Sequence, residues 1–208
     1  MRNNPLGKLA GRRLVRFGVI GVGGMGKGHC ATLGTVRQAR LAAVCDTDPG
    51  AAAQAARQFG VPSFPTHRRL IESGLCDAVT IATPHPAHGP IAIDCLEAGL
   101  PVLVEKPMAE RISMAEKMVR VARKSRTPLA VMFQRRFEPV FAKALQLTAA
   151  GAIGEVYRTC LISPEFRTQS YYDSGSWRAT WAGEGGGVLM NQAPHVMDLF
   201  IQLGGMPC

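Results

Sequence analysis

Residues 17–26 read Phe-Gly-Val-Ile-Gly-Val-Gly-Gly-Met-Gly, a short apolar run that leads into a glycine-rich loop. Its first four residues are typical of a buried strand, and the spacing G-x-G-x-x-G that follows opens a helix-compatible segment. The first glycine permits a tight turn, the second lets a pyrophosphate approach the backbone, and the third lets helix and strand pack closely. Free N–H groups at the helix start favour an anion. We therefore predict a dinucleotide site formed by Gly21, Gly23, Gly24, Met25 and Gly26.

Asp46 strengthens this prediction because it ends the next strand-like run, twenty-five residues after Gly21. A carboxylate at that position can accept hydrogen bonds from the diol of an adenosine ribose. Asp46 and Asp48 together would repel a 2′-phosphate, and no arginine follows within the next few residues, so NAD is favoured over NADP. The alternative is a glycine-rich turn in which Asp46 only caps the helix that begins near Asp48.

Short β-branched runs alternate with helical stretches from Val15 onward, which is typical of βαβ units on a parallel sheet. The sequence therefore predicts an α/β fold with a doubly wound parallel sheet of the Rossmann type. The strand candidates are Arg16–Ile20, Leu41–Cys45, Ala78–Ala82, Val102–Glu105 and Leu129–Phe133. The helix candidates are Met25–Thr35, Gly50–Phe59, Arg68–Ser73, Pro90–Ala98, Ser113–Arg123 and Pro139–Thr148.

The alternation stops near Gly151, where a strand-like run, Val156–Ile162, leads into a region rich in glycine, serine and tryptophan. We expect a Rossmann domain over residues 1–150, of which residues 1–14 form a basic tail. An incomplete α+β domain for substrate binding and oligomerisation is expected over residues 151–208.

The positive charge of the 208-residue chain is concentrated in its first 45 residues. The net charge is +9, which alone would suggest a nucleic acid or an anionic membrane. However, residues 1–45 carry eight Lys/Arg and no acid, whereas residues 46–208 carry sixteen Lys/Arg against fifteen Asp/Glu. A basic tail without interleaved aromatics is typical of a solvated terminus, and no apolar run approaches the length of a membrane span. We predict no nucleic-acid or membrane partner.

The six cysteines form no C-x-x-C pair and lie mostly in apolar runs, as buried reduced thiols do. Arg12-Arg13 before an apolar stretch is similar to a twin-arginine export signal, but cleavage after it would remove the glycine loop. We therefore predict a cytoplasmic protein. His85 and His88 have no cysteine or carboxylate at ligand spacing, so no metal site is predicted.

Four segments together resemble the Gfo/Idh/MocA oxidoreductases, the family of glucose–fructose oxidoreductase, inositol dehydrogenase and the rhizopine-catabolism protein MocA. The segments are 18–26, 77–84 with His88, 104–107, and 185–191 with His195 and Asp198. Members of this family normally continue into an open, mostly antiparallel sheet that covers the substrate pocket and forms the oligomer interface. A homo-oligomer is therefore implied for full-length relatives rather than for this chain.

Lys106 closes a predicted strand and would project at the carboxyl edge of the sheet, where doubly wound folds bind ligands. The resemblance implies that Lys106 binds the hydroxyl being oxidised, beside Glu105 at the cofactor, and that His195 is the general base. Asn191, His195 and Asp198 would share one helix face, unless Pro194 begins the helix and leaves Asn191 on a loop. Many members carry aspartate where this chain has Asn191.

Other candidates follow from the same resemblance. Thr83, Pro84 and His88 would pass over the nicotinamide ribose, and Arg135 would lie near the substrate, whereas Arg136 is expected to be solvated. Trp177 and Arg178 suit stacking on sugar rings and hydroxyl recognition. The alternatives are a surface lysine at position 106, a core histidine at position 195, ordinary loop histidines at 85 and 88, and aromatics that only pack the second domain onto the Rossmann domain.

The resemblance implies NAD-dependent oxidation of a secondary hydroxyl on a sugar, inositol or related polyol. Two alternatives stay open at this point. One is a non-catalytic NAD-binding fragment, and the other is a dihydrodiol, imine or tetrapyrrole reductase on the same framework.

Overall fold

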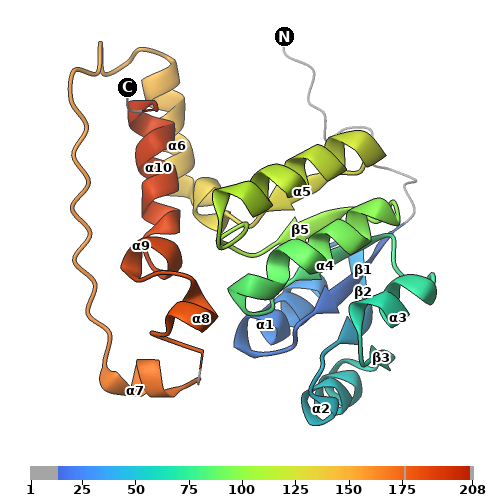
Figure 1. The fold of residues 1–208 in the computed structure, drawn as a ribbon. Coiled ribbons are helices and arrows are strands. Elements are labelled where there is room, and N and C mark those ends of the chain that lie inside the picture. The colour runs from blue at the N-terminus through green and yellow to red at the C-terminus, as the bar shows by residue number, and fades with distance from the viewer. Residues whose placement is uncertain (1–13, 176, 207–208) are drawn as a thin grey trace. The chain divides into compact units, whose positions relative to one another are not determined.

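The computed structural model describes residues 14–175 and 177–206. A six-stranded parallel sheet has the order β3-β2-β1-β4-β5-β6, which is the strand order typical of Rossmann folds (Figure 1). This confirms the predicted doubly wound α/β fold. The strands are β1 (Val15–Ile20), β2 (Ala39–Cys45), β3 (Ser63–Phe64), β4 (Ala78–Ile81), β5 (Val102–Val104) and β6 (Leu129–Val131).

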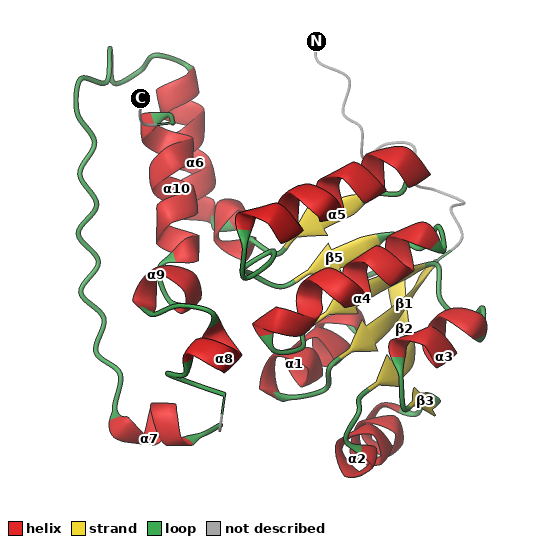
Figure 2. Cartoon of the chain, viewed as in Figure 1, coloured by secondary structure: helices red, strands yellow, loops and turns green. Residues whose placement is uncertain are grey.

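Helices follow the strands in alternation along the first two thirds of the chain, and the rest of the described chain consists of helices and loops without strands (Figure 2). They are α1 (Gly24–Leu33), α2 (Pro49–Phe59), α3 (His67–Glu72), α4 (His85–Glu97), α5 (Ile112–Ser125), the 3-10 turn η2 (Gln134–Phe137), α6 (Pro139–Ala149), α7 (Gln169–Asp173), α8 (Trp181–Glu184), α9 (Val188–Asn191) and α10 (Pro194–Gly204).

The helix α2 shows how local sequence signals set the element boundaries. The Asp48 carboxylate caps it by accepting from the backbone N–H groups of Gly50 and Ala51, and Pro49 occupies its first turn. Gly60 ends it at φ +67, a left-handed conformation that glycine adopts without a Cβ clash. The core beside this helix contains Val19, Val22, Cys30, Val44 and Ala55.

The structure differs from the predicted elements at β3, at the start of α4 and over residues 156–162. The two-residue strand β3 was not predicted, because it is too short to show a periodic pattern. The helix α4 begins at His85 instead of Pro90 and accommodates that proline within it. The predicted strand Val156–Ile162 is wrong, because this segment is a loop that pairs with no strand in the described residues (Figure 2).

The chain forms two compact units that interleave along the sequence. Unit 1 holds β1 to β4 with α1 to α3, and unit 2 holds η2 and α6 to α10. The predicted domain boundary after residue 150 stays a prediction. Unit 1 consists of the described residues up to Thr83, with Ile91–Leu103 and Arg120–Leu129, and unit 2 consists of Pro84–Pro90, Val104–Val119 and the described residues from Ala130 on.

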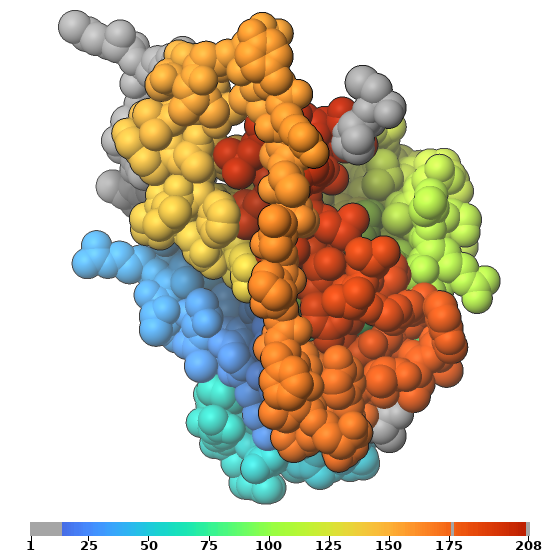
Figure 3. Space-filling model, turned by 90° about the vertical axis from the view of Figure 1, so that its left-hand side faces the viewer, coloured from blue at the N-terminus to red at the C-terminus, as the bar shows by residue number. Residues whose placement is uncertain are grey.

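Within unit 2, α6 and α10 pack side by side (Figure 1). The loop 155–168 forms a narrow ridge in front of them (Figure 3). Thr159 on this loop lies against Gly204 at the end of α10, where a Cβ on the glycine would contact the threonine side chain. Across the described ranges, the structure contains no helix both long enough and apolar enough to span a membrane.

Candidate functional site

The glycine loop after β1 shows why two of its glycines are required. Gly21 has φ +87, and a Cβ there would lie 2.7 Å from the carbonyl oxygen of Ala82. A Cβ on Gly26 would collide with the carbonyl oxygen of Gly21. Gly23 and Gly24 instead face open space, and no side chain caps the start of α1 at Gly23. The exposed N–H groups at this helix start can therefore receive an anion such as a pyrophosphate.

Asp46 anchors the loop from the end of β2. One carboxylate oxygen accepts from Val22 N at 2.8 Å, and the other accepts from Asp48 N at 2.9 Å. The N-cap of α2 is Asp48 and not Asp46, so the alternative in which Asp46 only caps this helix does not hold. Thr83 borders the same loop, since its backbone N lies 2.9 Å from the position of a Cβ on Gly21. Met25 is exposed beside these residues.

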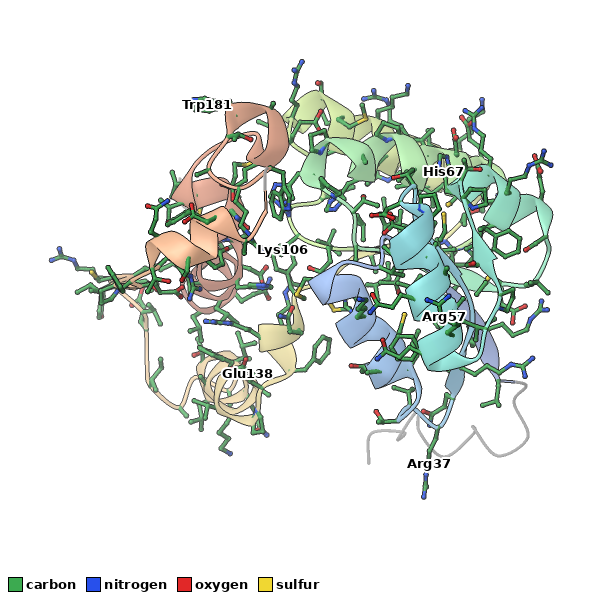
Figure 4. All side chains as sticks on the ribbon, turned by 90° about the horizontal axis from the view of Figure 1, so that it is seen from below. Arg37, Arg57, His67, Lys106, Glu138 and Trp181 are labelled. Atoms are coloured by element: carbon green, nitrogen blue, oxygen red, sulfur yellow. The ribbon has the colours of Figure 1, made fainter. Side chains whose placement is uncertain are left out.

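Lys106 lies half-buried in unit 2, next to the segment that carries Asn191 (Figure 4). Its Nζ donates to the carbonyl oxygen of Asn191 at 2.6 Å and to the side-chain Oδ1 of the same residue at 3.2 Å. Burial lowers the pKa of Lys106, the carboxylates of Glu105 and Glu184 raise it in part, and Arg178 lowers it. The reading of Lys106 as an ordinary surface lysine does not fit this environment.

Glu184 and His85 are site residues that the sequence analysis did not identify. Glu184 is 3% exposed, and its Oε1 accepts from the side-chain Nδ2 of Asn191. His85 is 4% exposed and donates from Nδ1 to the backbone oxygen of Glu184 at 2.9 Å. The one sequence signal for Glu184 is an acid set among glycines in Gly183-Glu184-Gly185-Gly186-Gly187.

Asn191 and His195 do not share one helix, because α9 ends at Asn191 and α10 begins at Pro194. Proline has no N–H to continue a helical ladder, so it begins α10. The ring of His195 packs edge-on against the ring of Phe133, with 6.1 Å between the ring centres. The buried Nδ1 of His195 has no hydrogen-bond partner among the described residues. Burial lowers the pKa of His195 below 6.5, and the positive charges of Lys106 and Arg135 lower it further.

Asp198 is held by Arg136 rather than by His195. The Arg136 guanidinium donates from Nε at 2.6 Å and from Nη2 to the two carboxylate oxygens. The expectation that Arg136 is merely solvated is therefore wrong. Asp198 still raises the pKa of His195 slightly, whereas Arg135, the residue before Arg136, lowers it.

His88 and Glu105 support the backbone around Lys106. His88 is fully buried and donates from Nδ1 to the carbonyl oxygen of Pro107 at 2.8 Å. Glu105 is 6% exposed and accepts from the backbone N of Lys106 at 3.2 Å. Pro84 immediately precedes α4, whose first residue is His85. Within this unit, His88 and Glu105 thus contact the lysine segment itself, whereas their predicted cofactor role stays a prediction.

Aromatic rings hold Arg178 near the lysine. Its guanidinium lies 4.4 Å from the ring centre of Tyr171 and 4.7 Å from that of Trp177. The Nε of Arg178 is buried and has no hydrogen-bond partner in the described part of the chain. The ring of Trp177 also packs edge-on against the ring of His85, with 5.6 Å between the ring centres.

Two family models match the sequence. Residues 15–133 match the GFO/IDH/MocA model described as an oxidoreductase family with an NAD-binding Rossmann fold, and residues 141–208 match the GFO/IDH/MocA C-terminal domain.

Curated relatives and a solved structure are similar to the chain. The chain is 38% identical over 142 residues to inositol 2-dehydrogenase of Rubrobacter xylanophilus, which covers 67% of this chain. It is 31% identical over 190 residues to the rhizopine catabolism protein MocA of Rhizobium meliloti, which covers 91% of this chain. The structure matches the WlbA dehydrogenase of Bordetella pertussis, solved with NADH and UDP-GlcNAcA, at a TM-score of 0.83, with 32% identity and 93% of this chain covered.

The chain spans about half the length of these proteins. It covers 41% of the Rubrobacter enzyme, 57% of MocA and 60% of the WlbA chain.

Proposed function

Because the chain belongs to the Gfo/Idh/MocA oxidoreductase family, we propose that it is an NAD-dependent dehydrogenase acting on a secondary hydroxyl of a sugar, inositol or related polyol. The observation that carries this proposal is the chemistry of unit 2. A half-buried ammonium at Lys106 is hydrogen-bonded to Asn191, and the same unit contains His195 with a buried, unpartnered Nδ1 and a lowered pKa.

These residues suit the oxidation of an alcohol. Lys106 would donate a hydrogen bond to the hydroxyl oxygen and stabilise its developing negative charge. His195, neutral at pH 7 because its pKa is lowered, would accept the hydroxyl proton. The C–H electron pair leaves as hydride while the carbon–oxygen double bond forms. NAD supplies the hydride acceptor when bound, and the Gly21–Gly26 loop with Asp46 would hold it.

The substrate class has two candidates within this reaction. The inositol dehydrogenases among the relatives favour a neutral polyol. The WlbA complex favours a nucleotide-linked sugar acid. Arg178 is consistent with an acidic substrate, because its buried Nε has no hydrogen-bond partner among the described residues. Its positive charge also lowers the pKa of Lys106, so Arg178 would bring a second cation to the lysine's surroundings. Arginine is suited to recognising a carboxylate.

The test is turnover by the purified chain, measured as NADH absorbance with inositols, aldoses and a UDP-linked uronic acid. We expect oxidation of at least one substrate, and a loss of about 100-fold or more in kcat for Lys106→Met, the scale typical of general acid–base groups. Lys143→Met is the matched control, because Lys143 is exposed in the same unit and its Nζ donates to Gln146 Oε1 at 3.4 Å.

NAD affinity, measured separately by calorimetry, should be equal in the wild type and in Lys106→Met. NAD binding without turnover on any substrate would favour a non-catalytic NAD-binding chain. Turnover that survives in Lys106→Met would remove the lysine from the chemistry.

A further inference from the structure

Glu184 is a buried acid whose carboxylate has no ion pair with a cation among the described residues. It is 3% exposed, and its hydrogen-bond partner is the neutral side chain of Asn191. A buried carboxylate is costly unless it is compensated, so its retention at this position requires a physical reason. The group next along the hydrogen-bonded chain is the ammonium of Lys106.

The backbone around Glu184 is fixed from several sides. Its N donates to Thr180 O at 2.9 Å, and Thr180 Oγ1 accepts from Gly183 N at 3.0 Å. Gly185 then ends α8 at φ +74, and His85 holds the Glu184 carbonyl oxygen. The carboxylate therefore presents its oxygen to Asn191 from a fixed point.

This contact determines which way the Asn191 amide faces. A carboxylate only accepts hydrogen bonds, so the NH₂ group of Asn191 must point to Glu184. The amide oxygen consequently faces the other way, toward Lys106 Nζ at 3.2 Å. With the amide reversed, Nδ2 would face the ammonium and two donors would oppose each other. Donation to a carboxylate also polarises the amide, which strengthens its oxygen as an acceptor.

We propose that Glu184 is a positioning residue that acts through Asn191 to hold the ammonium of Lys106 in place for the substrate hydroxyl. The proposal rests on the proposed dehydrogenase function for its consequence, but its geometry is independent of turnover. Glu184 also acts by charge, because it raises the pKa of Lys106 against the larger lowering effect of burial. The other charged groups that act on Lys106 are Glu105 and Arg178.

The test is the titration of Lys106 by NMR of ¹³C-labelled lysine side chains, with the signal assigned from Lys106→Arg. Glu184→Gln removes the charge but keeps an oxygen that can accept from Asn191, and Glu184→Ala removes both. We expect each substitution to lower the pKa of Lys106 and to shift the side-chain amide signals of Asn191. Glu165→Gln is the matched control, since Glu165 pairs with Arg167 elsewhere in unit 2 and should leave both signals unchanged.

Activity provides the second readout. Glu184→Gln should lower kcat by about tenfold, a size common for residues that orient a functional side chain through a hydrogen bond. NAD affinity should stay unchanged. Glu184→Asp should bring the pKa of Lys106 part of the way back toward its wild-type value, because it restores the negative charge at position 184.

An unchanged Lys106 titration together with unchanged Asn191 amide signals in Glu184→Gln would overturn the proposal. If the wild-type chain turned over no substrate, the proposed function would fail while the titration still decided the role of Glu184. Should Glu184→Ala not fold, Glu184→Gln alone decides.

Discussion

Asp46 shows how one side chain can be both a structural anchor and a candidate ligand group. Its two oxygens each accept one backbone N–H, at 2.8 and 2.9 Å. A carboxylate has about four acceptor positions, so hydrogen bonds from a ribose diol remain possible beside these two. The carboxylate of its neighbour Asp48 caps α2 instead of contacting the glycine loop, which makes the pair a natural comparison.

Asp46→Ala should weaken NAD binding by about tenfold or more, because the ribose would lose a charged acceptor worth roughly 1.5–3 kcal/mol. It should also narrow the preference for NAD over NADP, since one of the two charges that repel a 2′-phosphate is gone. Calorimetric titration with both cofactors measures each effect.

Asp48→Ala is the control for this pair. It should lower the free energy of unfolding by about 1 kcal/mol through loss of the α2 cap. It should leave NAD affinity nearly unaltered, and it should narrow the preference for NAD over NADP less than Asp46→Ala does, because it removes only the second of the two charges that repel a 2′-phosphate. Equal NAD affinity in the wild type and Asp46→Ala would contradict the assignment of Asp46 to the ribose.

His195 makes the pH dependence of the proposed reaction specific. Burial and the charges of Lys106 and Arg135 lower its pKa below 6.5, so the neutral form persists into mildly acidic solution. The rate of alcohol oxidation should therefore hold from neutral pH down to about pH 6.5 and fall only below it. Arg135→Gln should move this decline to higher pH, because it removes one of the charges that lower the pKa. A decline in the wild type centred above pH 7 would contradict this assignment.

At the scale of elements, the sequence was most informative where a pattern is local. Alternating runs predicted five of the six strands, and the predicted helix Gly50–Phe59 ends where α2 ends. The segment 156–162 has the residue types of a strand, but strand formation needs a partner, and the described residues supply none.

Site residues joined by long-range contacts could not be predicted in the same way. The bond between His85 and Glu184 links positions 99 residues apart, and no local pattern encodes such a contact. Lys106 and Asn191 were both identified from the family resemblance, yet their direct hydrogen bond became visible only in the structure. The ion pair of Asp198 with Arg136 likewise joins residues 62 positions apart and became visible only in the structure.

The helix α1 offers a matched pair of glycine substitutions. Gly26→Ala should destabilise unit 1 by about 2 kcal/mol or more and abolish NAD binding, because its Cβ would collide with the Gly21 carbonyl oxygen. Gly28→Ala, on the exposed side of the same helix with open space around its Cβ, should instead stabilise by up to about 1 kcal/mol. Thermal unfolding with and without NAD distinguishes the two. Comparable stability in both variants would show that close packing at Gly26 is not required.

At the scale of the whole molecule, the reactivity of the cysteine thiols measures how often the fold opens. Cys30, Cys45 and Cys95 are buried in unit 1, whereas Cys160 is exposed in unit 2. Burial raises the pKa of Cys30 to about 11 and that of Cys45 and Cys95 to about 12. Since the thiolate is the reactive form, these three thiols are both inaccessible and almost fully protonated near pH 8.

Alkylation with iodoacetamide at pH 8, followed by peptide mass spectrometry, should therefore modify Cys160 first and the three buried thiols only through unfolding. A ligand that binds the folded state lowers the unfolded population, and NAD at one hundred times its Kd does so by about 100-fold. We expect NAD to slow the modification of Cys30, Cys45 and Cys95 by up to that factor, and to leave Cys160 nearly unaffected. Cys160 acts as the internal control, because its exposure needs no unfolding. Buried thiols that react as fast as Cys160 in the absence of NAD would show that unit 1 is not stably packed. Protection of Cys160 alone would place the NAD effect outside unit 1.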